Sequence, residues 1–369
     1  MQFDFTAPCY FGLESAAAFD FRRLGAENLK ITDGRVTFTG DARLLADANL
    51  WSRCAERIMI KLAAFPAATF DELFDRVYAI PWEDYIPRNG KFPVKGSSLS
   101  STLSSVPACQ SIVKKAVVER LRKGHRVEFL PERSEEYRIR FSIRKDMAEV
   151  FLDTSGDGLH KRGYRRLAGG APLKETLAAA MADFGRVRRD SRVEDPFCGS
   201  GTLVIEAALK ALNIAPGLRR SFAAEHYAFL PEGLFAEARA AAEAEKKTDA
   251  AFAGAGFDID PEMVALAAAN AEKAGVGSVC RFEARDVAAY RADSSALMMT
   301  NPPYGERLLD AGAAAKLEQA LGRATAAAPP ASAYVITADA EFERHFGRVA
   351  KKRRKVYNGM IPCQIYMYY

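Results

Sequence analysis

The chain has 369 residues, of which 49% are hydrophobic and 27% are charged, a balance typical of globular proteins and not of disordered ones. This length is more than one hydrophobic core usually organises, so we expect two or three domains. The net charge of +5 is mild and permits a polyanionic partner without requiring one.

Six cysteines are scattered without a C-x-x-C pair, and the four histidines do not lie at metal-ligand intervals from one another. We therefore expect free thiols in a reducing compartment and no metal site. The N-terminus lacks a basic leader, and no run approaches the roughly 20 apolar residues of a membrane helix. These features predict a soluble, cytoplasmic protein without a membrane partner.

The first 157 residues read as an α+β region in which strands and helices alternate. Asp33-Gly34 between two β-rich runs is a strong hairpin signal. The periodicity predicts strands at 3–9, 28–40 (the hairpin), 58–65, 91–95, 136–146 and 147–155, and helices at 14–24, 41–55, 69–78 and 109–122.

From about residue 160 the pattern changes: strand-like runs end in Asp, Gly or Asn-Pro, and alanine-rich helical runs separate them. Such alternation predicts a doubly wound, mostly parallel sheet with its ligand at the carboxyl ends of the strands. Helices are expected at 202–212, 261–274 and 313–327, and a hairpin around Asn358-Gly359 closes the chain.

The most informative motif is Asn301-Pro302-Pro303-Tyr304, directly after the apolar run ALMM. The exocyclic amine of a base is a poor nucleophile, and two hydrogen-bond acceptors on its N–H groups would favour a lone pair aimed at a methyl donor. The Asn301 amide oxygen and the Pro302 carbonyl can supply them, and the prolines hold both in place. Tyr304 offers a face for stacking an extruded base. The alternative is a plain turn after a strand.

A glycine-rich turn, DPFCGSGT at 195–202, closes one predicted strand and opens a helix. Its glycines allow close backbone approach to a ligand, and the helix start presents unpaired N–H groups. The spacing is neither G-x-G-x-x-G nor a P-loop, which favours S-adenosylmethionine over a dinucleotide or ATP. The candidate cofactor residues here are Asp195, Cys198, Gly199, Ser200, Gly201 and Thr202; a tight β–α turn is the alternative.

Two further aspartates end the following strands. Asp258 can accept both hydroxyls of a ribose, whereas Asp260 before Pro261 looks like a helix N-cap. Asp286 is placed for the adenine amino group, unless it is a surface loop residue. The interval from Gly201 to Asp258 is longer than the ~20 residues of the dinucleotide fingerprint, so we expect a helical insertion over 219–248. Four successive strand ends would thus share one site.

Basic residues suggest contacts to RNA phosphates. Lys114 and Lys115 lie on the helix at 109–122, and Lys161, Arg162 and Arg165 precede the catalytic half. A run of five, KKRRK, occupies 351–355. The alternative for each group is a solvated face.

With these motifs, the chain resembles the bacterial THUMP-domain class I RNA methyltransferases related to the 23S ribosomal RNA guanine-N2 methyltransferase. Matching segments include DTSGDGLHKRGYR, DPFCGSGTLVIEAAL, GFDIDPEMV, TNPPYGERL and KVYNGMIPCQIYMYY. The resemblance spans essentially the whole chain. It implies that Lys174, Glu175 and Thr176 lie near the methionine end of the cofactor, and that Asn301 and Tyr304 bind the amine and stack the base. Phe197, where we expect a smaller residue, departs from the pattern.

The expected architecture is therefore α/β: a ferredoxin-like subdomain at 1–60, a THUMP RNA-binding domain at 61–157, and a Rossmann-like seven-stranded methyltransferase domain at 158–369. The expected activity is methylation of guanine N2 in RNA, with 23S ribosomal RNA preferred. Transfer RNA guanine-N2 methylation and adenine-N6 methylation of nucleic acid remain alternatives, as does a non-enzymatic RNA-binding role in ribosome assembly.

Overall fold

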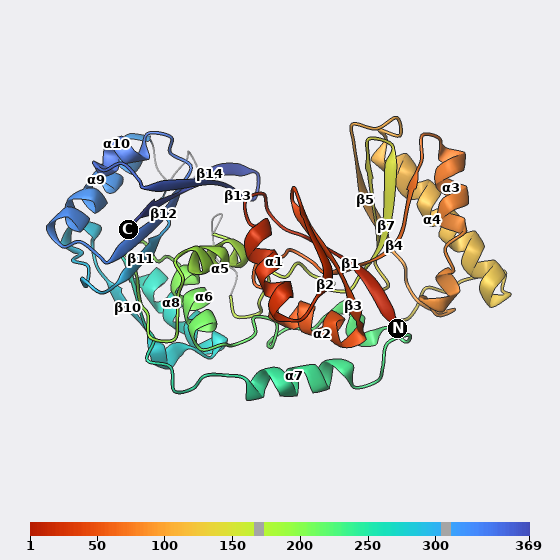
Figure 1. Cartoon of the computed structure of the whole chain (residues 1–369), viewed down its shortest axis with the longest axis horizontal. Coiled ribbons are helices and arrows are strands. Elements are labelled where there is room, and N and C mark those ends of the chain that lie inside the picture. The colour runs from red at the N-terminus through yellow and green to blue at the C-terminus, as the bar shows by residue number, and fades with distance from the viewer. Residues whose placement is uncertain (166–172, 304–310) are drawn as a thin grey trace.

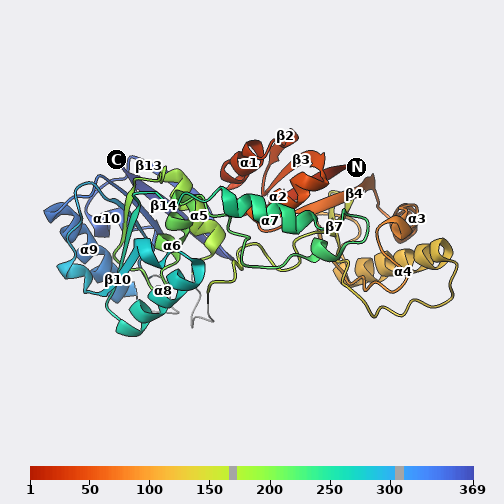
Figure 2. The same cartoon turned by 90° about the horizontal axis from the view of Figure 1, so that it is seen from below.

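A computed structural model describes residues 1–165, 173–303 and 311–369. The molecule is elongated, with the THUMP-like region at one end, the C-terminal sheet at the other and the first helices between them (Figure 1). The described residues form two seven-stranded sheets. Turning the molecule shows the same three parts in a row (Figure 2).

The N-terminal sheet has the strand order β2-β3-β1-β4-β7-β6-β5 and joins both expected N-terminal domains. Strand β4 pairs with β1 through Met59 and Ile60 and with β7 along its whole length, so a boundary at residue 60 falls inside one strand. The strands are β1 (Gln2–Pro8), β2 (Glu27–Thr32), β3 (Arg35–Asp41), β4 (Met59–Pro66), β5 (Val94–Leu99), β6 (Ile139–Arg144) and β7 (Met147–Asp153).

The helices of this half begin at recognisable caps. The Asp41 carboxylate accepts from the Leu44 amide, and Thr69 with Glu72 forms a capping box. Ser105 caps the long helix three residues before the predicted start, because Pro107 fits the first turn. The helices are α1 (Glu14–Arg23), α2 (Ala42–Trp51), α3 (Phe70–Tyr78) and α4 (Val106–His125), with a 3-10 turn at Trp82–Asp84.

One helix and one strand of this half have bounds that differ from the predicted ones. The helix expected to reach residue 55 ends at Trp51, because the following backbone turns away and the Arg53 amide donates to the Asp20 carboxylate at 2.8 Å. The strand expected at 91–95 lies at Val94–Leu99, and Lys91 makes only an isolated bridge to Glu136.

The C-terminal sheet has the order β10-β9-β8-β11-β12-β14-β13. Its first five strands are parallel to one another, and β14 is antiparallel to both β12 and β13, as the predicted terminal hairpin requires. The strands are β8 (Arg192–Asp195), β9 (Ala253–Asp258), β10 (Cys280–Ala284), β11 (Leu297–Thr300), β12 (Ser332–Thr337), β13 (Lys352–Asn358) and β14 (Ile361–Tyr368). The helices are α5 (Glu175–Phe184), α6 (Thr202–Ala211), α7 (Leu234–Ala244), α8 (Pro261–Ala274), α9 (Ala311–Ala327) and α10 (Phe342–Phe346), with 3-10 turns at Ala223–His226, Gly277–Val279 and Val287–Ala289.

The expected insertion leaves the C-terminal sheet and returns to the N-terminal half. Residues 212–233, which we call the strap, lead to α7, and α7 packs beside α2 (Figures 1 and 2). The Gly217 amide donates to the Leu50 carbonyl at 2.9 Å, and a Cβ on Gly217 would lie 2.8 Å from the Leu50 Cα. Buried apolar residues of both halves consequently form one continuous cluster.

The described helices include none that is long and apolar enough to span a membrane.

Candidate active site

The glycine-rich turn follows β8 and leads into α6. Gly199 and Gly201 have φ of +49° and +82°, in the left-handed region that favours glycine. A Cβ on Gly199 would meet nothing within 4 Å, so this backbone borders open space. A Cβ on Gly201 would lie 3.0 Å from that of Ala267, so this glycine allows α8 to pack closely. The turn therefore has an open side and a packed side.

Asp258 at the end of β9 holds the turn. One carboxylate oxygen accepts from the Gly199 amide at 2.9 Å, and the other accepts from the Asp260 amide at 3.0 Å. The side chain is only partly buried, so its remaining lone pairs border the same space. Asp260 caps α8 as predicted, accepting from the Glu262 amide at 2.8 Å.

Asp286 lies at the next strand end, after β10. It is exposed and accepts from the Ala288 amide at 2.8 Å, which caps the 3-10 turn at Val287–Ala289. One carboxylate oxygen of Asp286 thus caps the turn, while the exposed carboxylate can still accept further hydrogen bonds.

Asp195 lies beneath the turn and is 1% exposed. Its carboxyl accepts from the Thr300 hydroxyl at 2.6 Å and from the Phe197 amide at 3.0 Å. Burial, with a smaller contribution from the charge of Asp258, raises the pKa of Asp195 to about 7. Because Thr300 ends β11, this hydrogen bond ties the glycine turn to the strand end that carries Asn301.

The neighbouring residues of the turn are also largely enclosed. Cys198 is 6% exposed, and burial raises the pKa of its thiol, so it is no reactive nucleophile. Its backbone amide donates to the Phe257 carbonyl at 2.8 Å. Ser200 and Thr202 are buried with their hydroxyl oxygens 3.3 Å apart, and the Asn270 amide donates to the Ser200 carbonyl.

Asn301 directly follows β11, which pairs with β8 in parallel. Its amide oxygen Oδ1 is buried and has no hydrogen-bond partner within the described part of the chain. Pro302 is buried and Pro303 is half-buried. Tyr304, predicted to stack the base, lies outside the described residues. A buried acceptor without a donor is costly, which makes this oxygen a candidate acceptor for a donor on a ligand.

The start of α5 joins the two halves of the molecule. Thr176 donates its hydroxyl to the Glu56 carboxylate at 2.8 Å, and the Lys174 ammonium lies 3.7 Å from the same carboxylate and contacts the Tyr10 hydroxyl. Glu175 is 4% exposed and lies 3.4 Å from Arg165. No sequence pattern singled out Glu56, because its partners lie more than a hundred residues away.

Arg162, predicted to contact RNA, is 3% exposed, and this prediction is corrected. Its guanidinium is 3.5 Å from the buried Glu206 carboxylate and donates to the carbonyls of Leu159 and Ser52. A side chain enclosed in this way cannot reach a phosphate. It instead connects the N-terminal half to α6.

Arg165 is largely buried as well. It donates to the Leu173 carbonyl at 2.8 Å and contacts the Thr202 hydroxyl at the start of α6. It therefore lies beside the glycine turn, closer to the candidate cofactor residues than its predicted RNA contact implied.

The remaining predicted RNA contacts lie on the surface. Lys161 is well exposed and 3.2 Å from Asp157. Lys115 is also well exposed, whereas Lys114 is held 2.8 Å from Glu132 and lies over the Phe92 ring. In the terminal basic run, Arg353 pairs with Glu343, and Arg354 donates to the Gly12 carbonyl at 2.9 Å.

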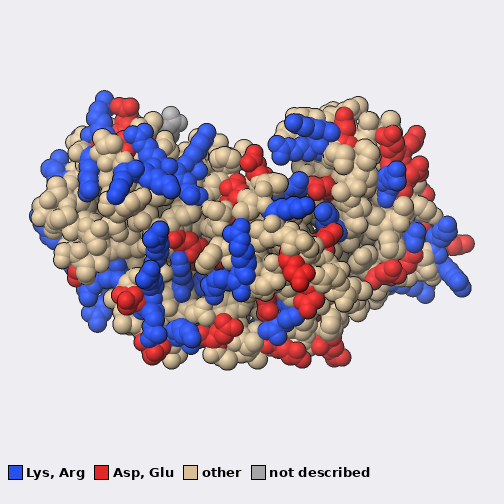
Figure 3. Space-filling model, viewed as in Figure 1, with Lys and Arg blue, Asp and Glu red and all other residues tan. Residues whose placement is uncertain are grey.

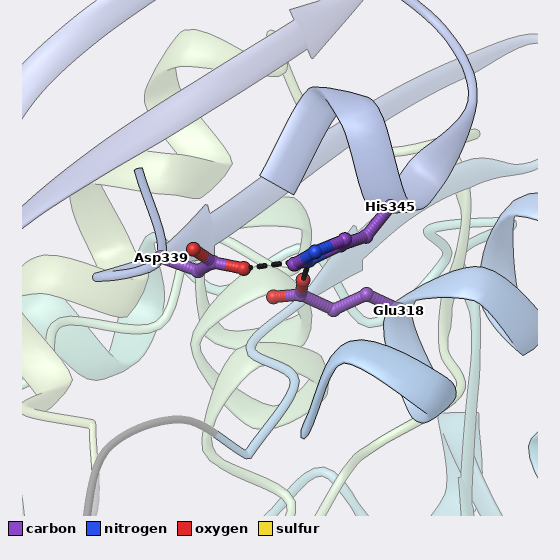
Figure 4. Close-up of side chains that lie close together, drawn as sticks. All are labelled: Glu318, Asp339 and His345. Carbon is purple, nitrogen blue, oxygen red and sulfur yellow. Dashed lines mark hydrogen bonds and ion pairs between the residues drawn. The ribbon is translucent and has the colours of Figure 1, made fainter. Parts of the chain in front are cut away.

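A separate polar cluster lies after β12, one strand beyond Asn301. His345 Nδ1 is 3.0 Å from the Glu318 carboxylate and 2.9 Å from the Asp339 carboxylate (Figure 4). Burial raises the pKa of Glu318 to about 7, and the hydrogen bond to Glu318 raises the pKa of His345. The three ligand-type atoms lie within 4.8 Å of one another, but these hydrogen bonds account for that spacing. The cluster clamps α9, β12 and α10 together.

The sheet order, the glycine turn after β8 and the acceptor after β11 define a class I methyltransferase fold. The chain belongs to the family of the RMKL-like methyltransferase domain, which matches residues 162–367. The RlmL ferredoxin-like domain matches residues 4–59 and the THUMP domain matches residues 67–153. The predicted family and fold class are thus confirmed, and so is S-adenosylmethionine as the methyl donor of this family.

Full-length relatives agree with this membership. The chain is 44% identical to the "Putative RNA methyltransferase YpsC" of Bacillus subtilis (strain 168), covering 99% of this chain and 94% of that protein. It is 36% identical to the ribosomal RNA large subunit methyltransferase K/L of Syntrophotalea carbinolica, covering 99% of this chain and 53% of that protein. The chain therefore spans about half the length of that relative.

A solved structure is similar throughout. The crystal structure of SMU.472 complexed with SAH is 39% identical, with a TM-score of 0.93, covering 100% of this chain and 98% of that one.

Proposed function

We propose that this protein transfers a methyl group from S-adenosylmethionine to the exocyclic N2 of a guanine in RNA, with 23S ribosomal RNA as the preferred substrate. The observation that carries the proposal is the buried amide oxygen of Asn301, which has no hydrogen-bond partner among the described residues and follows the strand next to the one that leads into the glycine turn. The names of the relatives, an RNA methyltransferase and a ribosomal RNA methyltransferase, support RNA as the substrate. Such a substrate is cytoplasmic.

The described residues fit the donor molecule. The open space over Gly199 admits an adenosyl group to the backbone, and the Asp258 carboxylate is available to ribose hydroxyls. Asp286 would reach the adenine, and Lys174, Glu175 and Thr176 would border the methionine end. The donor supplies an electrophilic methyl group on a sulfonium.

The residues after β11 act on the acceptor amine. The Asn301 amide oxygen and the Pro302 carbonyl accept its two N–H groups, which turns the nitrogen lone pair toward the methyl group. Both acceptors are fixed before the substrate arrives, because Pro302 and Pro303 restrict the backbone. Tyr304 would stack on the base, which excludes water from the reacting atoms. As the N–CH3 bond forms, the S–CH3 bond would break with its electron pair left on the sulfur, and one N–H proton would pass to solvent, which restores a neutral amine.

The first experiment tests the acceptor. Asn301→Ala should lower the rate of tritiated methyl transfer to RNA by about 100-fold or more, the usual effect of removing one preorganised hydrogen-bonding group. Binding of S-adenosylmethionine should stay within about twofold of wild type. Asn301→Asp keeps an acceptor oxygen and should retain more activity than the alanine variant. An unchanged rate in Asn301→Ala would overturn the mechanism.

The Asp258→Ala variant tests the binding of the methyl donor. We expect it to weaken binding of S-adenosylmethionine while RNA affinity stays unchanged, because Asp258 holds the turn and not the RNA. Calorimetric titration measures the first quantity and fluorescence anisotropy the second. An equal loss of both affinities would count against this role.

The second experiment identifies the base. Mass spectrometry of RNA from a deletion strain and from the complemented strain should show one N2-methylguanosine lost and restored in 23S ribosomal RNA. If the same change occurred in transfer RNA, the substrate would be transfer RNA instead. If the lost modification were N6-methyladenosine, the methylated base would be adenine instead of guanine. The absence of any lost modification would favour a role without catalysis.

A further inference from the structure

A large open cleft lies outside the candidate active site, between the THUMP-like region and the catalytic half. Its volume is about 1060 Å³. Its lining comes from the N-terminal sheet edge around Lys91 and Arg138, the linker at residues 154–165, the start of α5 at Glu175, and the strap around Arg219 and Arg220. It therefore borders both the N-terminal half and the segments that lead into the catalytic half.

The cleft is polar and predominantly cationic. Seven Lys and Arg residues line it against four Asp and Glu residues. Figure 3 shows that basic and acidic side chains are mixed over the N-terminal half on this face, whereas basic ones outnumber acidic ones over the C-terminal sheet. The one Phe in the lining, Phe222, is 2% exposed, so its ring offers no stacking surface. A cationic groove whose exposed rings are limited to the imidazoles of His160 and His226, with no exposed Phe, Tyr or Trp in its described lining, suits a sugar-phosphate backbone better than a row of unstacked bases.

Some of these cationic side chains stabilise the walls of the cleft and are not available to a ligand. Arg220 donates to the carbonyls of Ser155, Asp157, Gly158 and Lys161, which fastens the strap to the linker. Arg162 and Arg165 are enclosed, as described above. These arginines shape the cleft and leave little capacity for a ligand.

Other cations are available. Arg219 and Lys91 are exposed, and neither side chain has a hydrogen bond or ion pair among residues 1–165, 173–303 and 311–369. Arg138 lies 2.9 Å from Glu136, and Lys161 lies 3.2 Å from Asp157, as partly or fully exposed pairs. Exposed pairs of this kind are worth about 0–1 kcal/mol, so a phosphate can exchange with the carboxylate.

The cleft adjoins the candidate active site through shared residues. Arg165 and Glu175 line the cleft, and Arg165 also contacts Thr202 at the start of α6. A backbone that follows the cleft from Lys91 past Arg219 would therefore deliver its nucleotide beside the glycine turn.

We propose that this cleft binds the sugar-phosphate backbone of a folded RNA, with Arg219 and Lys91 as direct phosphate ligands and no reading of base sequence. The proposal rests on the proposed function for the identity of the polyanion. It assigns capture to two segments of the lining, one in the N-terminal half and one in the strap.

The test uses the full-length protein with two charge-neutral substitutions, Lys91→Gln and Arg219→Gln, combined. Its matched control is Lys30→Gln with Arg323→Gln, two exposed cations outside the cleft. The probes are a fluorescent 16-base-pair RNA duplex of arbitrary sequence and a transcript of 23S ribosomal RNA. The dissociation constant is measured by anisotropy and competition between 50 and 300 mM salt.

We expect the cleft variant to bind both probes about tenfold or more weakly at low salt. The slope of log affinity against log salt should be shallower by about 2, because each of the two substitutions removes one phosphate ligand. The control should keep the wild-type slope, and S-adenosylmethionine binding should be unchanged in both. An unchanged slope in the cleft variant would overturn the proposal, as would weakening confined to one sequence. These readouts do not depend on which base is methylated, so a wrong guanine assignment leaves them interpretable.

Discussion

The buried carboxyl of Asp195 connects the two elements on which the proposed chemistry depends. It lies under the glycine turn and accepts the Thr300 hydroxyl one residue before Asn301. Because burial disfavours the charged carboxylate, the neutral form of Asp195 is favoured in the folded state, and its pKa rises to about 7. Its role is therefore structural and sensitive to pH.

The sign of that sensitivity follows from the pKa shift. The folded pKa of about 7 lies above the ordinary value of 3.8, so the contribution to stability is fully present below about pH 4 and is lost as pH rises through 7. Asp195→Asn keeps an oxygen for Thr300 and Phe197 but cannot ionise. We expect the free energy of unfolding to fall less between pH 5 and 8 in this variant than in wild type.

Urea unfolding at four pH values checks this prediction. Exposed Asp190→Asn is the control and should follow the wild-type profile. Asp20 and Glu318 also have pKa values raised to about 7 by burial, so they contribute to the pH dependence of every protein measured. The effect of Asp195 is therefore the difference between the variant and wild type. Parallel profiles for Asp195→Asn and wild type would contradict the assignment.

At the scale of elements, the linker is fixed against α6 by a buried ion pair. Arg162 lies 3.5 Å from Glu206, which is fully buried and also accepts from the Tyr164 hydroxyl at 3.1 Å. Removing one partner of a buried pair leaves the other charge uncompensated. The pair therefore joins the two halves more firmly than an exposed pair would.

Arg162→Ala should lower the free energy of unfolding by about 3–5 kcal/mol. The neighbouring Lys161→Ala removes an exposed cation and should change stability by no more than about 0.5 kcal/mol. Chemical denaturation measures both, and the salt dependence of RNA binding should be unaltered in folded Arg162→Ala. A stable Arg162→Ala variant with a shallower salt slope would restore Arg162 as an RNA contact.

At the scale of the whole molecule, the catalytic half is not separate from the N-terminal half. The strap and α7 pack on α2, and the apolar cluster runs through both halves. Residues such as Phe222 and Phe235 are buried in the full chain. Separating the halves would expose part of this shared core.

We therefore expect the fragment 158–369 to unfold without a cooperative thermal transition and to bind a hydrophobic dye. In the full chain, the ferredoxin-like part and the catalytic part should unfold together in a single transition. Circular dichroism and dye fluorescence provide the measurements. A fragment that melts cooperatively within a few degrees of the full chain would show that the shared core is dispensable.

Local signals determined much of the fold. Caps such as Thr69 and Asp260, the turn at Asp33-Gly34, and strand ends at Asp195, Asp258 and Asn301 act over a few residues, so the sequence alone predicted the elements and their order. Errors occurred where a distant partner decided the outcome. The end of α2 depends on Asp20, and the burial of Arg162 depends on Glu206.

The sequence by itself determined the alternating elements, the family resemblance and the tetrapeptide Asn301–Tyr304, because each is written in neighbouring residues. Only the tertiary structure decided that β8 and β11 are adjacent, that the Asn301 oxygen is buried without a partner in the described part of the chain, and that the strap closes one wall of a cationic cleft. Burial and charge pairing depend on which distant segments come into contact, and those contacts depend on the path that the chain takes through both halves.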